Sequence, residues 1–434
     1  MMSVAIGALV VLVVLLTLGV SLPFCFGGSL MYMALIGGVN MKGMMLWGLG
    51  QITNPVLLCV PLFILAGTLM SESGIAKYLL DFVNVFVGRK RGGLGVVASV
   101  SCAIIGAISG SGFTGVAAVG PILIPRMEQE GYPRGYATAL VTNSSILGLL
   151  IPPSVVMIVY GWVTETSILA CFLATIGPGL LVTFLFSFIN VIWAKKFDLK
   201  IEPKLSTQEK LKQIKSRTWM ALPALMMPFI ILGGIYGGIM TPTEAAGVAV
   251  VYSIPVGFFI YKGLNKNNFF KIAWNSATAV GAIMIMIFFC LMLSQTFVMM
   301  RVPQALVELL FGVTQNKVIL LILINILLFF VGMIVNDITG IILVAPLLLP
   351  LAQSIGINPI QFAAIMGVNL AMGGVTPPYA SILYLGMRIG NVEFMDIIKP
   401  AMVLLLLGYV PVVFLTSFWP DLSMFLPTLL GFVH

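Results

Sequence analysis

The sequence predicts an all-α polytopic membrane protein, and three observations support this fold class. The 434 residues are 60% hydrophobic and only 8% charged, with a mean hydropathy of +1.13. Apolar runs of about 17 to 25 residues, long enough to cross roughly 30 Å of hydrocarbon as helices, recur from end to end. The third observation is an internal repeat whose two copies have opposite predicted orientations. A β-barrel is excluded because the apolar runs are continuous and lack an alternation of period two.

The sequence lacks the motifs of several other protein classes. Its five cysteines are isolated in apolar segments and form no C-x-x-C pair, so neither a metal cluster nor a disulfide framework is expected. No G-x-x-x-x-G-K-[ST] motif is present, so the chain is not expected to use ATP. The lone histidine, His434, is the last residue, and the apolar segments hold no acid pair, which disfavours an enzyme. We expect no organic cofactor and no nucleic-acid partner.

Three regions are expected along the chain. Residues 1–194 form a first hydrophobic half, which starts with a membrane helix over residues 4–22, since no basic residue precedes that run as it would in a signal peptide. Residues 195–218 form a basic cytoplasmic linker with eight of the 22 Lys and Arg residues. Its part from 207 to 217 is either a short interfacial helix or disordered. Residues 219–434 form the second hydrophobic half.

The distribution of Lys and Arg predicts how these segments cross the membrane. With the linker in the cytoplasm, residues 94–125 start and end at basic clusters on the same side, so they are expected to form a re-entrant hairpin. Residues 318–350 are expected to form a second hairpin, entered from the outer side. All but three of the 22 Lys and Arg residues then face the cytoplasm, as the positive-inside rule requires. Both termini are expected in the periplasm, and the protein in a bacterial inner membrane.

An internal repeat relates the two halves of the sequence. Matching residues are separated by a constant distance along the chain, which is the distance from Thr114 to Thr339. Each copy holds a hairpin followed by an interrupted helix, which is expected over residues 136–165 and 361–386. Inverted repeats with helix-breaking residues at matching positions are typical of secondary transporters. The matching residues are Thr114 with Thr339, Gly115 with Gly340, Pro121 with Pro346, Pro125 with Pro350, Gly131 with Gly356, Pro152 with Pro377, Pro153 with Pro378 and Gly161 with Gly386, whereas Asn143 and Asn369 miss this register by one residue.

Polar and flexible residues mark four predicted breaks, two in each copy. Non-helical backbone at membrane depth is tolerated only where it is buried in protein or lines a wet cavity. There, carbonyl, hydroxyl and amide oxygens can bind a small cation, and free N–H groups at helix starts can bind a carboxylate. We expect one central site flanked by two ion sites. The candidate residues are Ser109, Gly110, Ser111, Gly112 and Thr114 at the first tip, Asn143, Ser144, Ser145 and Pro152 in the first interrupted helix, Asn336, Asp337, Thr339 and Gly340 at the second tip, and Asn369, Gly373, Thr376 and Pro377 in the second interrupted helix.

Several of these residues have a structural interpretation beside the functional one. Ser109 and Ser111 could satisfy backbone groups of a kinked helix, and Asn143 and Asn369 could be interhelical hydrogen-bond partners. The paired prolines are interpreted first as helix breakers, whose preceding carbonyls could serve an ion. Asp337 is costly at membrane depth, so it is expected either to contact an ion or the substrate, or to constrain the hairpin.

Five stretches of the sequence resemble the large permease subunit of TRAP transporters, the tripartite ATP-independent periplasmic family. They are ISGSGFTGVAAVGPILIPRM, GLLIPPSVVMIVYG, MTPTEAAGVAVVYS, VNDITGIILVAPLLLPLAQSIGINPIQF and TPPYASILYLG. The likeness covers nearly the whole chain, and its specificity comes from the combination, since each motif alone is weak. Phe113 departs from it, because the family's first tip is rich in small polar residues.

The resemblance implies an elevator-type ion-transporter fold and a secondary active importer driven by a sodium gradient. The hairpins and interrupted helices would form a mobile transport domain, and the outer helices a scaffold in the lipid bilayer. The implied partners are a small TRAP membrane subunit, a periplasmic substrate-binding protein and an organic-acid substrate such as sialic acid or a C4-dicarboxylate. Sodium would be the coupling ion. Its expected ligands are Ser109, Ser111, Asn143, Asp337, Thr339 and Thr376.

Two other functions are compatible with the same pattern of breaks. One is a stand-alone ion-coupled carboxylate transporter that needs no binding protein, and the other is an ion channel built on the same broken helices. No cationic residue falls in the four breaks, so a carboxylate would be held by helix dipoles and bound sodium. This feature does not choose between a dicarboxylate and a sugar acid.

Overall fold

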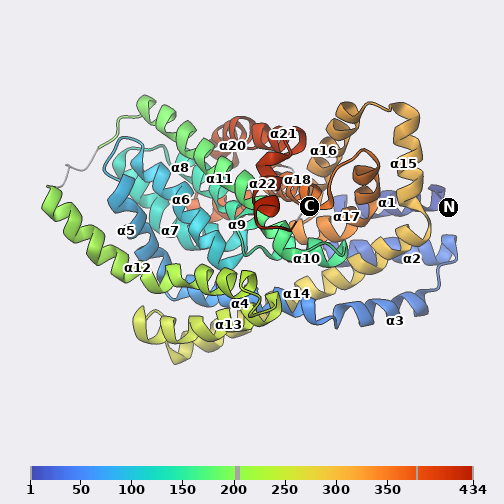
Figure 1. The fold of residues 1–434 in the computed structure, drawn as a ribbon, viewed down its shortest axis with the longest axis horizontal. Helices are drawn as coiled ribbons and strands as arrows, with labels where there is room; N and C mark the ends of the chain where they lie inside the picture. Colours follow the sequence, from blue (N-terminus) through green and yellow to red (C-terminus); the bar gives the residue numbers. More distant parts are fainter. Residues whose placement is uncertain (1, 201–205, 378–379, 433–434) are drawn as a thin grey trace.

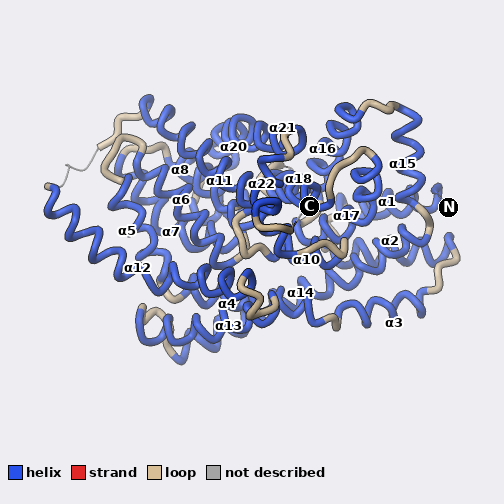
Figure 2. The backbone as a smooth tube through the Cα atoms, viewed as in Figure 1, coloured by secondary structure: helices blue, strands red, loops and turns tan. Residues whose placement is uncertain are grey.

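The computed structural model describes residues 2–200, 206–377 and 380–432, and these residues are almost entirely helical (Figure 2). No β-strand occurs in these ranges. Eight of the described helices are long and apolar enough to cross a membrane, or nine if the bent pair Arg134–Leu150 and Val155–Val163 counts as one span. The predicted all-α polytopic fold is confirmed.

The first half of the chain contains a hairpin and an interrupted helix. The hairpin arms are α6 and α7, which are separated by two residues, and the interrupted helix consists of α8, α9 and α10. The elements are α1 (Met2–Thr17), α2 (Leu22–Gly37), α3 (Met41–Ile52), α4 (Cys59–Glu72), α5 (Ile75–Val87), α6 (Gly93–Ser109), α7 (Gly112–Glu130), α8 (Arg134–Ser145), α9 (Leu147–Leu150), α10 (Val155–Val163) and α11 (Ile168–Trp193).

The second half contains the same two units in the same order. The hairpin arms are α16 and α17, again separated by two residues, and the interrupted helix consists of α18 and α19. The elements are α12 (Thr207–Tyr236), α13 (Pro242–Pro255), α14 (Lys266–Met299), α15 (Val302–Val313), α16 (Lys317–Ile334), α17 (Asp337–Ser354), α18 (Pro359–Gly373), α19 (Ser381–Gly390), α20 (Phe394–Leu404), α21 (Val410–Phe418) and α22 (Asp421–Leu429).

The two halves exchange contacts in a reciprocal way, and one of these contacts, between α10 and α17, can be followed in Figure 1. Helix α7 of the first hairpin packs against α19 of the second interrupted helix, and α17 of the second hairpin packs against α10 of the first interrupted helix. The same exchange pairs α8 with α20 and α18 with α11. Reciprocal contacts of this kind are expected when two repeats are related by an approximate two-fold axis. Both halves therefore build the core around the breaks.

Hydrogen bonds tie the ends of the exchanged helices together. Arg134, the first residue of α8, donates from Nε to the carbonyl oxygen of Gly390 at the end of α19, at 2.6 Å. It also pairs with Glu128 of α7 at 2.6 Å. Tyr160 of α10 donates its hydroxyl to the carbonyl oxygen of Pro359 at the start of α18, at 2.7 Å. Arg134 and Pro359 occupy matching positions of the repeat, so the start of each interrupted helix is bonded to the second part of the other.

The basic linker passes into the membrane as one long helix. The N-cap Ser206 and Glu209 form a capping box, in which the Ser206 hydroxyl accepts from the Glu209 N–H and the Glu209 carboxylate accepts from the Ser206 N–H. The first helix breaker after this start is Pro223. Residues 207–217 are therefore the first turns of α12, and the predicted boundary between residues 218 and 219 falls inside this helix.

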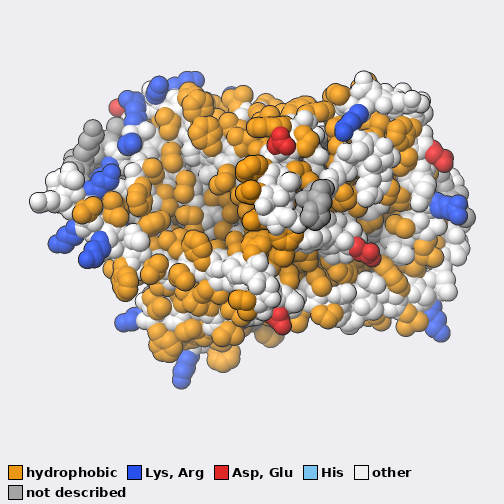
Figure 3. All heavy atoms as spheres, viewed as in Figure 1, with side chains coloured by type: hydrophobic (Ala, Val, Ile, Leu, Met, Phe, Trp, Pro, Cys, Tyr) orange, Lys and Arg blue, Asp and Glu red, His pale blue; other side chains and the backbone are white. Residues whose placement is uncertain are grey.

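Apolar side chains cover much of the molecular face in Figure 3, and Lys and Arg side chains gather mainly at its left end, where α12 begins. Large apolar residues are strongly exposed, including Trp219 at 75%, Phe229 at 71% and Phe259 at 77%. A soluble protein rarely exposes so much contiguous apolar surface. The surface therefore fits a lipid environment, which favours exposed apolar side chains.

Candidate functional site

The tip of the first hairpin is a two-residue reversal between α6 and α7. Gly110 adopts a φ of +63°, and its N–H donates to the carbonyl oxygen of Gly106 at 2.7 Å. Ser109 is 2% exposed, and its hydroxyl donates to the carbonyl oxygen of Ser111 at 3.4 Å. Ser111 is the N-cap of α7, but its hydroxyl makes no capping bond. The first N–H groups of α7 therefore lack the side-chain acceptor that an N-cap residue usually supplies.

The first tip packs into the break of the first interrupted helix. A Cβ atom on Gly106 would overlap the Cα of Gly148, and one on Gly148 would lie 2.9 Å from the carbonyl oxygen of Ser111. A Cβ atom on Gly110 would lie 2.9 Å from the carbonyl oxygen of Pro153. Glycine is needed for such close backbone approach. The carbonyl oxygens of Ser111 and Pro153 thus lie at the junction between tip and break.

The other candidates at the first tip differ in their exposure. Gly112 is the buried first residue of α7, while Thr114 in its first turn is half-buried. Phe113 is 38% exposed, so its bulk does not have to fit inside the junction. The predicted departure at this position is thereby accommodated at the surface of the tip.

Three neighbouring polar residues end α8, and their side chains have different partners. Asn143 is fully buried; its amide nitrogen donates to the carbonyl four residues earlier at 2.9 Å, and its amide oxygen has no hydrogen-bond partner among the described residues. The hydroxyl oxygens of Ser144 and Ser99 are 3.0 Å apart, which joins α8 to α6. The Ser145 hydroxyl donates to a carbonyl of its own helix at 2.8 Å. Only Asn143 leaves a buried acceptor unused, and such groups are rare in folded proteins.

The interruption itself spans residues 151–154 between α9 and α10. Pro152 is buried there, and the peptide bond between Pro152 and Pro153 is cis. The Ser154 hydroxyl donates to the carbonyl oxygen of Leu149 at 2.6 Å, so it closes part of the broken hydrogen-bond ladder. The two prolines cannot donate backbone N–H groups, which explains why the helix stops at this point.

The tip of the second hairpin is capped, unlike the first. The side-chain oxygen of Asn336 accepts from the N–H groups of Ile338 at 3.0 Å and Thr339 at 3.4 Å. The buried Thr339 hydroxyl and the Gly340 N–H both donate to the Asn336 carbonyl oxygen, at 3.0 and 2.7 Å. Asp337 is half-buried as the first residue of α17, where the helix dipole favours a carboxylate. The side chain of Asn336 is therefore committed to the helix start.

The second interrupted helix carries a buried asparagine whose amide oxygen is also free. Asn369 donates from its amide nitrogen to the side-chain oxygen of Asn325 on α16 at 2.7 Å, and to the carbonyl four residues earlier at 2.8 Å. Its own amide oxygen has no hydrogen-bond partner within the described ranges. Asn325 also donates to the Ser417 hydroxyl of α21 at 2.9 Å. Three helices therefore meet in one buried polar network.

The second break follows this network along the chain. Gly373 ends α18, and a Cβ atom on it would lie 2.5 Å from the Cα of Gly332 in α16. Thr376 is 4% exposed, and its hydroxyl donates to the carbonyl oxygen four residues earlier at 2.8 Å. Pro377 is half-buried, whereas the predicted breaker Pro378 lies outside the described residues.

The two hairpin–helix pairs make matching contacts. In each half, a glycine of the first hairpin arm contacts a glycine of the interrupted helix, and a polar residue of the arm bonds to a polar residue of that helix. On the interrupted helices, the contacting residues of the two halves are separated by the same spacing as the repeat, so Asn369 occupies the position of Ser144. On the hairpin arms, the contacting residues of the two halves are separated by one residue more than this spacing. The matching pairs are Gly106–Gly148 with Gly332–Gly373, and Ser99–Ser144 with Asn325–Asn369.

The first tip also reaches the second interrupted helix. A Cβ atom on Gly112 would lie 2.9 Å from the Cδ1 of Ile382 and 3.5 Å from the carbonyl oxygen of Ser145. The Ile382 N–H donates across the second break to the carbonyl oxygen of Gly374 at 3.3 Å. The first tip thus lies between the end of α8 and the restart of α19. We call the residues of the two tips and two breaks the central polar region.

The central polar region offers oxygen atoms rather than nitrogen or sulfur ligands. No three His, Cys, Asp or Glu side chains cluster anywhere in the described part of the chain. The available ligand atoms are backbone carbonyl oxygens, hydroxyl oxygens, the carboxylate of Asp337 and the amide oxygens of Asn143 and Asn369. Hard cations prefer such oxygen ligands, whereas transition metals prefer imidazole and thiolate.

Sequence reasoning missed the residues on the hairpin arms that contact the breaks. They are Ser99 and Gly106 on α6, and Asn325 and Gly332 on α16. In each arm the polar residue and the glycine are seven apart, so they share one helix face. Aligning the sequences of the two hairpin arms with an offset one residue longer than that of the repeat would have matched Ser99 with Asn325 and Gly106 with Gly332.

Paired hairpins and interrupted helices that exchange contacts define a polytopic membrane protein of the inverted-repeat transporter class. The model of the family described as "Tripartite ATP-independent periplasmic transporter, DctM component" matches residues 9–422 of this chain. The chain belongs to this family, whose members are large permease subunits of TRAP transporters and not enzymes. The resemblance found in the sequence motifs is confirmed.

Individual proteins show the same relationship. The C4-dicarboxylate TRAP transporter large permease protein DctM of Pseudomonas aeruginosa is 35% identical over 375 residues, which cover 86% of this chain and 87% of that protein. The sialic acid TRAP transporter large permease protein SiaM of Vibrio cholerae is 32% identical over 392 residues, which cover 90% of each. The solved structure of Neisseria gonorrhoeae MtrF is 13% identical with a TM-score of 0.58, covering 89% of this chain and 85% of that one, and it supports the fold alone.

Proposed function

We propose that this chain is the large membrane subunit of a sodium-coupled TRAP importer for an organic acid. In this proposal the protein lies in the bacterial inner membrane with both termini in the periplasm. The observation that carries the proposal is a pair of buried amide oxygens, those of Asn143 and Asn369, one at each interrupted helix, which have no hydrogen-bond partner within the described part of the chain. Each can supply a ligand to a small cation, together with hydroxyl and carbonyl oxygens of the same break.

The packing of tips against breaks supports a coupling mechanism. Binding of one sodium ion at each hairpin–helix pair would fix the tip against the break and reduce the cost of carrying exposed polar backbone through an apolar scaffold. The uncapped N–H groups at the start of α7 would then receive the substrate carboxylate. The ties from Arg134 and Tyr160 would keep the hairpins and interrupted helices together as one transport domain. This domain moves as an elevator between the two sides of the membrane.

The substrate is proposed to be an organic acid. Relatives are named for C4-dicarboxylates, sialic acid, ectoine and isethionate. Every one of these named substrates carries a carboxylate or sulfonate group, which suits the helix N-terminus at the first tip. Sialic acid and C4-dicarboxylates are our first candidates.

Two partners complete the proposed importer. TRAP large permeases work with a substrate-binding protein and often with a small membrane subunit. The relative from Oleidesulfovibrio alaskensis is named DctMQ, and this chain spans 58% of its length. We propose that the binding protein delivers the substrate on the periplasmic side and that the small subunit is a separate chain.

Uptake into proteoliposomes tests the proposal. The chain is reconstituted with its small membrane subunit and its binding protein, and radiolabelled acids are offered under an inward sodium or potassium gradient. We expect saturable uptake only with sodium and only with the binding protein. Uptake that is unchanged without a sodium gradient would contradict the coupling. Uptake without the binding protein would indicate a stand-alone transporter, and conductance without saturable flux would indicate a channel.

A further inference from the structure

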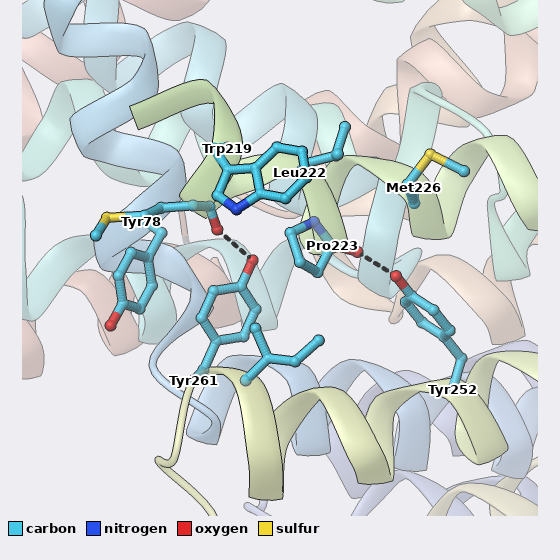
Figure 4. A pocket seen from close by; sticks show the side chains of 9 residues that line it. Tyr78, Trp219, Leu222, Pro223, Met226, Tyr252 and Tyr261 are labelled. Atoms are coloured by element: carbon cyan, nitrogen blue, oxygen red, sulfur yellow. Dashed lines mark hydrogen bonds between the residues drawn. The ribbon is translucent and has the colours of Figure 1, made fainter. Parts of the chain in front are cut away.

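An aromatic groove lies outside the central polar region, where α5, α12 and the end of α13 meet (Figure 4). It encloses a cavity of about 490 Å³, with Tyr78 of α5, Trp219 of α12 and Tyr261 after α13 among its walls. The rings of Tyr78 and Tyr261 are 4.7 Å apart between centroids. Trp219 is 75% exposed, so the groove opens towards the surroundings of the protein.

Two of the three tyrosine hydroxyls in the groove, those of Tyr252 and Tyr261, are bound to the backbone of α12. The Tyr261 hydroxyl donates to the carbonyl oxygen of Met220 at 2.9 Å and accepts from the N–H of Ala224 at 3.2 Å. The Tyr252 hydroxyl donates to the carbonyl oxygen of Pro223 at 2.8 Å (Figure 4). Pro223 lacks an N–H, so the helix ladder is already open at this turn. Because these hydroxyls are used, the tyrosines present ring faces, and the groove is apolar and preformed.

A second hollow continues the groove towards the start of α12. It encloses about 460 Å³ and is lined by α12 side chains that include Lys212, Ser216 and Met220. Met220 lines both cavities. Residues 212, 216 and 220 are spaced by four and share one face of the helix. The second hollow is walled mainly by polar and charged residues, among them Glu209, Lys212 and Ser216, and we call it the polar hollow. It follows the aromatic groove along the same side of α12.

The polar hollow lies in a cationic environment. The first turns of α12 contain Lys210, Lys212, Lys215 and Arg217 but only one acid, Glu209. The Glu209 carboxylate accepts the N–H and hydroxyl of the N-cap Ser206, and Arg217 pairs with Asp81 at 2.5 Å. Lys212 is exposed and has no ion pair within the described residues. Its ammonium group remains available to an anion.

We propose that this composite groove binds one anionic phospholipid of the cytoplasmic leaflet. The phosphate would contact Lys212 and Ser216, and an acyl chain would lie on the rings of Tyr78 and Tyr261. Along α12 the polar hollow precedes the aromatic groove, as the headgroup of a lipid precedes its acyl chains. Trp219 lies where the two cavities meet, and tryptophan is typical of the membrane–water boundary. Basic pockets between membrane helices on the cytoplasmic side suit anionic headgroups. The choice of leaflet rests on the proposed orientation of the chain, whereas the site is otherwise independent of the proposed transport function. The lipid would join α5, α12 and α13.

Native mass spectrometry of the full chain tests the proposal. The protein is exchanged into micelles that contain either phosphatidylglycerol or phosphatidylcholine, and the lipid that stays bound is counted. We expect one retained phosphatidylglycerol per chain and little phosphatidylcholine. Lys212→Gln is expected to lower phosphatidylglycerol retention about fivefold, because one basic residue near a lipid surface contributes about 1 kcal/mol. Lys42→Gln removes an exposed lysine far from the groove along the chain and serves as the matched control.

A second variant tests the apolar part of the groove. Trp219→Ala removes an exposed wall of the groove and should weaken retention while leaving the fold intact, because the side chain is 75% exposed. Equal retention of the two lipids, or the same retention in Lys212→Gln and Lys42→Gln, would overturn the proposal. A photoreactive residue at position 219 that captures the small membrane subunit in place of lipid would also overturn it, since the groove would then be a protein-docking surface.

Discussion

Gly106 of the first hairpin lies directly against Gly148 of the first interrupted helix, so closely that a Cβ atom on Gly106 would overlap the Cα of Gly148. Gly332 and Gly373 make the matching contact in the second half. Each of these interrupted helices also carries a buried asparagine, Asn143 or Asn369, whose amide oxygen has no hydrogen-bond partner among the described residues. The close backbone approach therefore brings the tip of each hairpin to the oxygen atoms of its break.

Gly106→Ala should disturb this approach. The added methyl meets backbone atoms that cannot move aside, so we expect overpacking to cost about 1–3 kcal/mol and the hairpin to shift. The relative loss of uptake should be larger than the relative loss of thermal stability, because the tip is displaced from the break. Gly281→Ala in α14 is the matched control, since a Cβ atom there meets nothing within 4 Å. Equal uptake by the two variants would contradict the role of the glycine contact.

The unused amide oxygens give a second prediction. Asn143→Ala and Asn369→Ala each remove one proposed sodium ligand, and contacts to charged groups contribute about 1.5–3 kcal/mol. We therefore expect the sodium concentration for half-maximal uptake to rise at least about tenfold in each variant. Ser187→Ala in α11 is the control, because its hydroxyl donates to the carbonyl oxygen of Thr183 in the same helix. The effect is measured by titrating uptake with sodium. If the sodium concentration for half-maximal uptake is unchanged in both asparagine variants, these residues are not sodium ligands.

The tip residues give a third prediction. Thr114 is half-buried in the first turn of α7, and Asp337 begins α17. If they contribute to the cation sites, Thr114→Ala and Asp337→Asn should both weaken the sodium dependence of uptake. Asp337→Asn keeps the size of the side chain, so a loss there reports the charge. Sodium dependence that stays unchanged in both variants would refute the assignment of the tips.

The repeat made the fold and the position of the breaks predictable. Gly and Pro residues interrupt apolar runs, and their recurrence at the spacing that relates Thr114 to Thr339 pointed to two hairpins and two interrupted helices in one chain. Described helices end at several of those residues, for example at Gly131 after α7 and at Pro152 in the first break, whereas Pro121 and Pro125 lie inside α7, and Pro346 and Pro350 inside α17. Local chemistry is sufficient here, because Pro removes a backbone donor and Gly permits the left-handed turn.

The partners of the breaks could not be predicted in the same way. Gly106 and Ser99 look like ordinary small residues of an apolar helix, and their roles depend on which helix packs against them. The tie from Arg134 to Gly390 joins distant parts of the sequence and likewise depends on tertiary packing. The continuity of α12 was missed because the linker was judged by its charge, whereas the capping box at Ser206 starts a helix regardless of charge.

Arg134 gives a fourth prediction. Its side chain is partly exposed, so the ion pair with Glu128 contributes little, and the hydrogen bond to the Gly390 carbonyl is the larger contribution. Arg134→Gln should cost about 1–3 kcal/mol and lower the thermal unfolding temperature in detergent. Arg388→Gln, an exposed arginine in the last turn of the same α19, is the control. Equal unfolding temperatures would show that this tie does not hold the exchanged helices together.

The most direct test of the central claim is sodium binding by the purified protein. Thermal unfolding is followed in detergent with sodium, potassium or choline chloride at the same ionic strength. Two cation sites built from the tips and breaks predict selective stabilisation by sodium, about 2.7 kcal/mol for each site at a concentration one hundred times its dissociation constant. The account predicts a higher unfolding temperature in sodium for the wild type and a smaller increase in Asn143→Ala and Asn369→Ala. The same unfolding temperature in all three salts would contradict it.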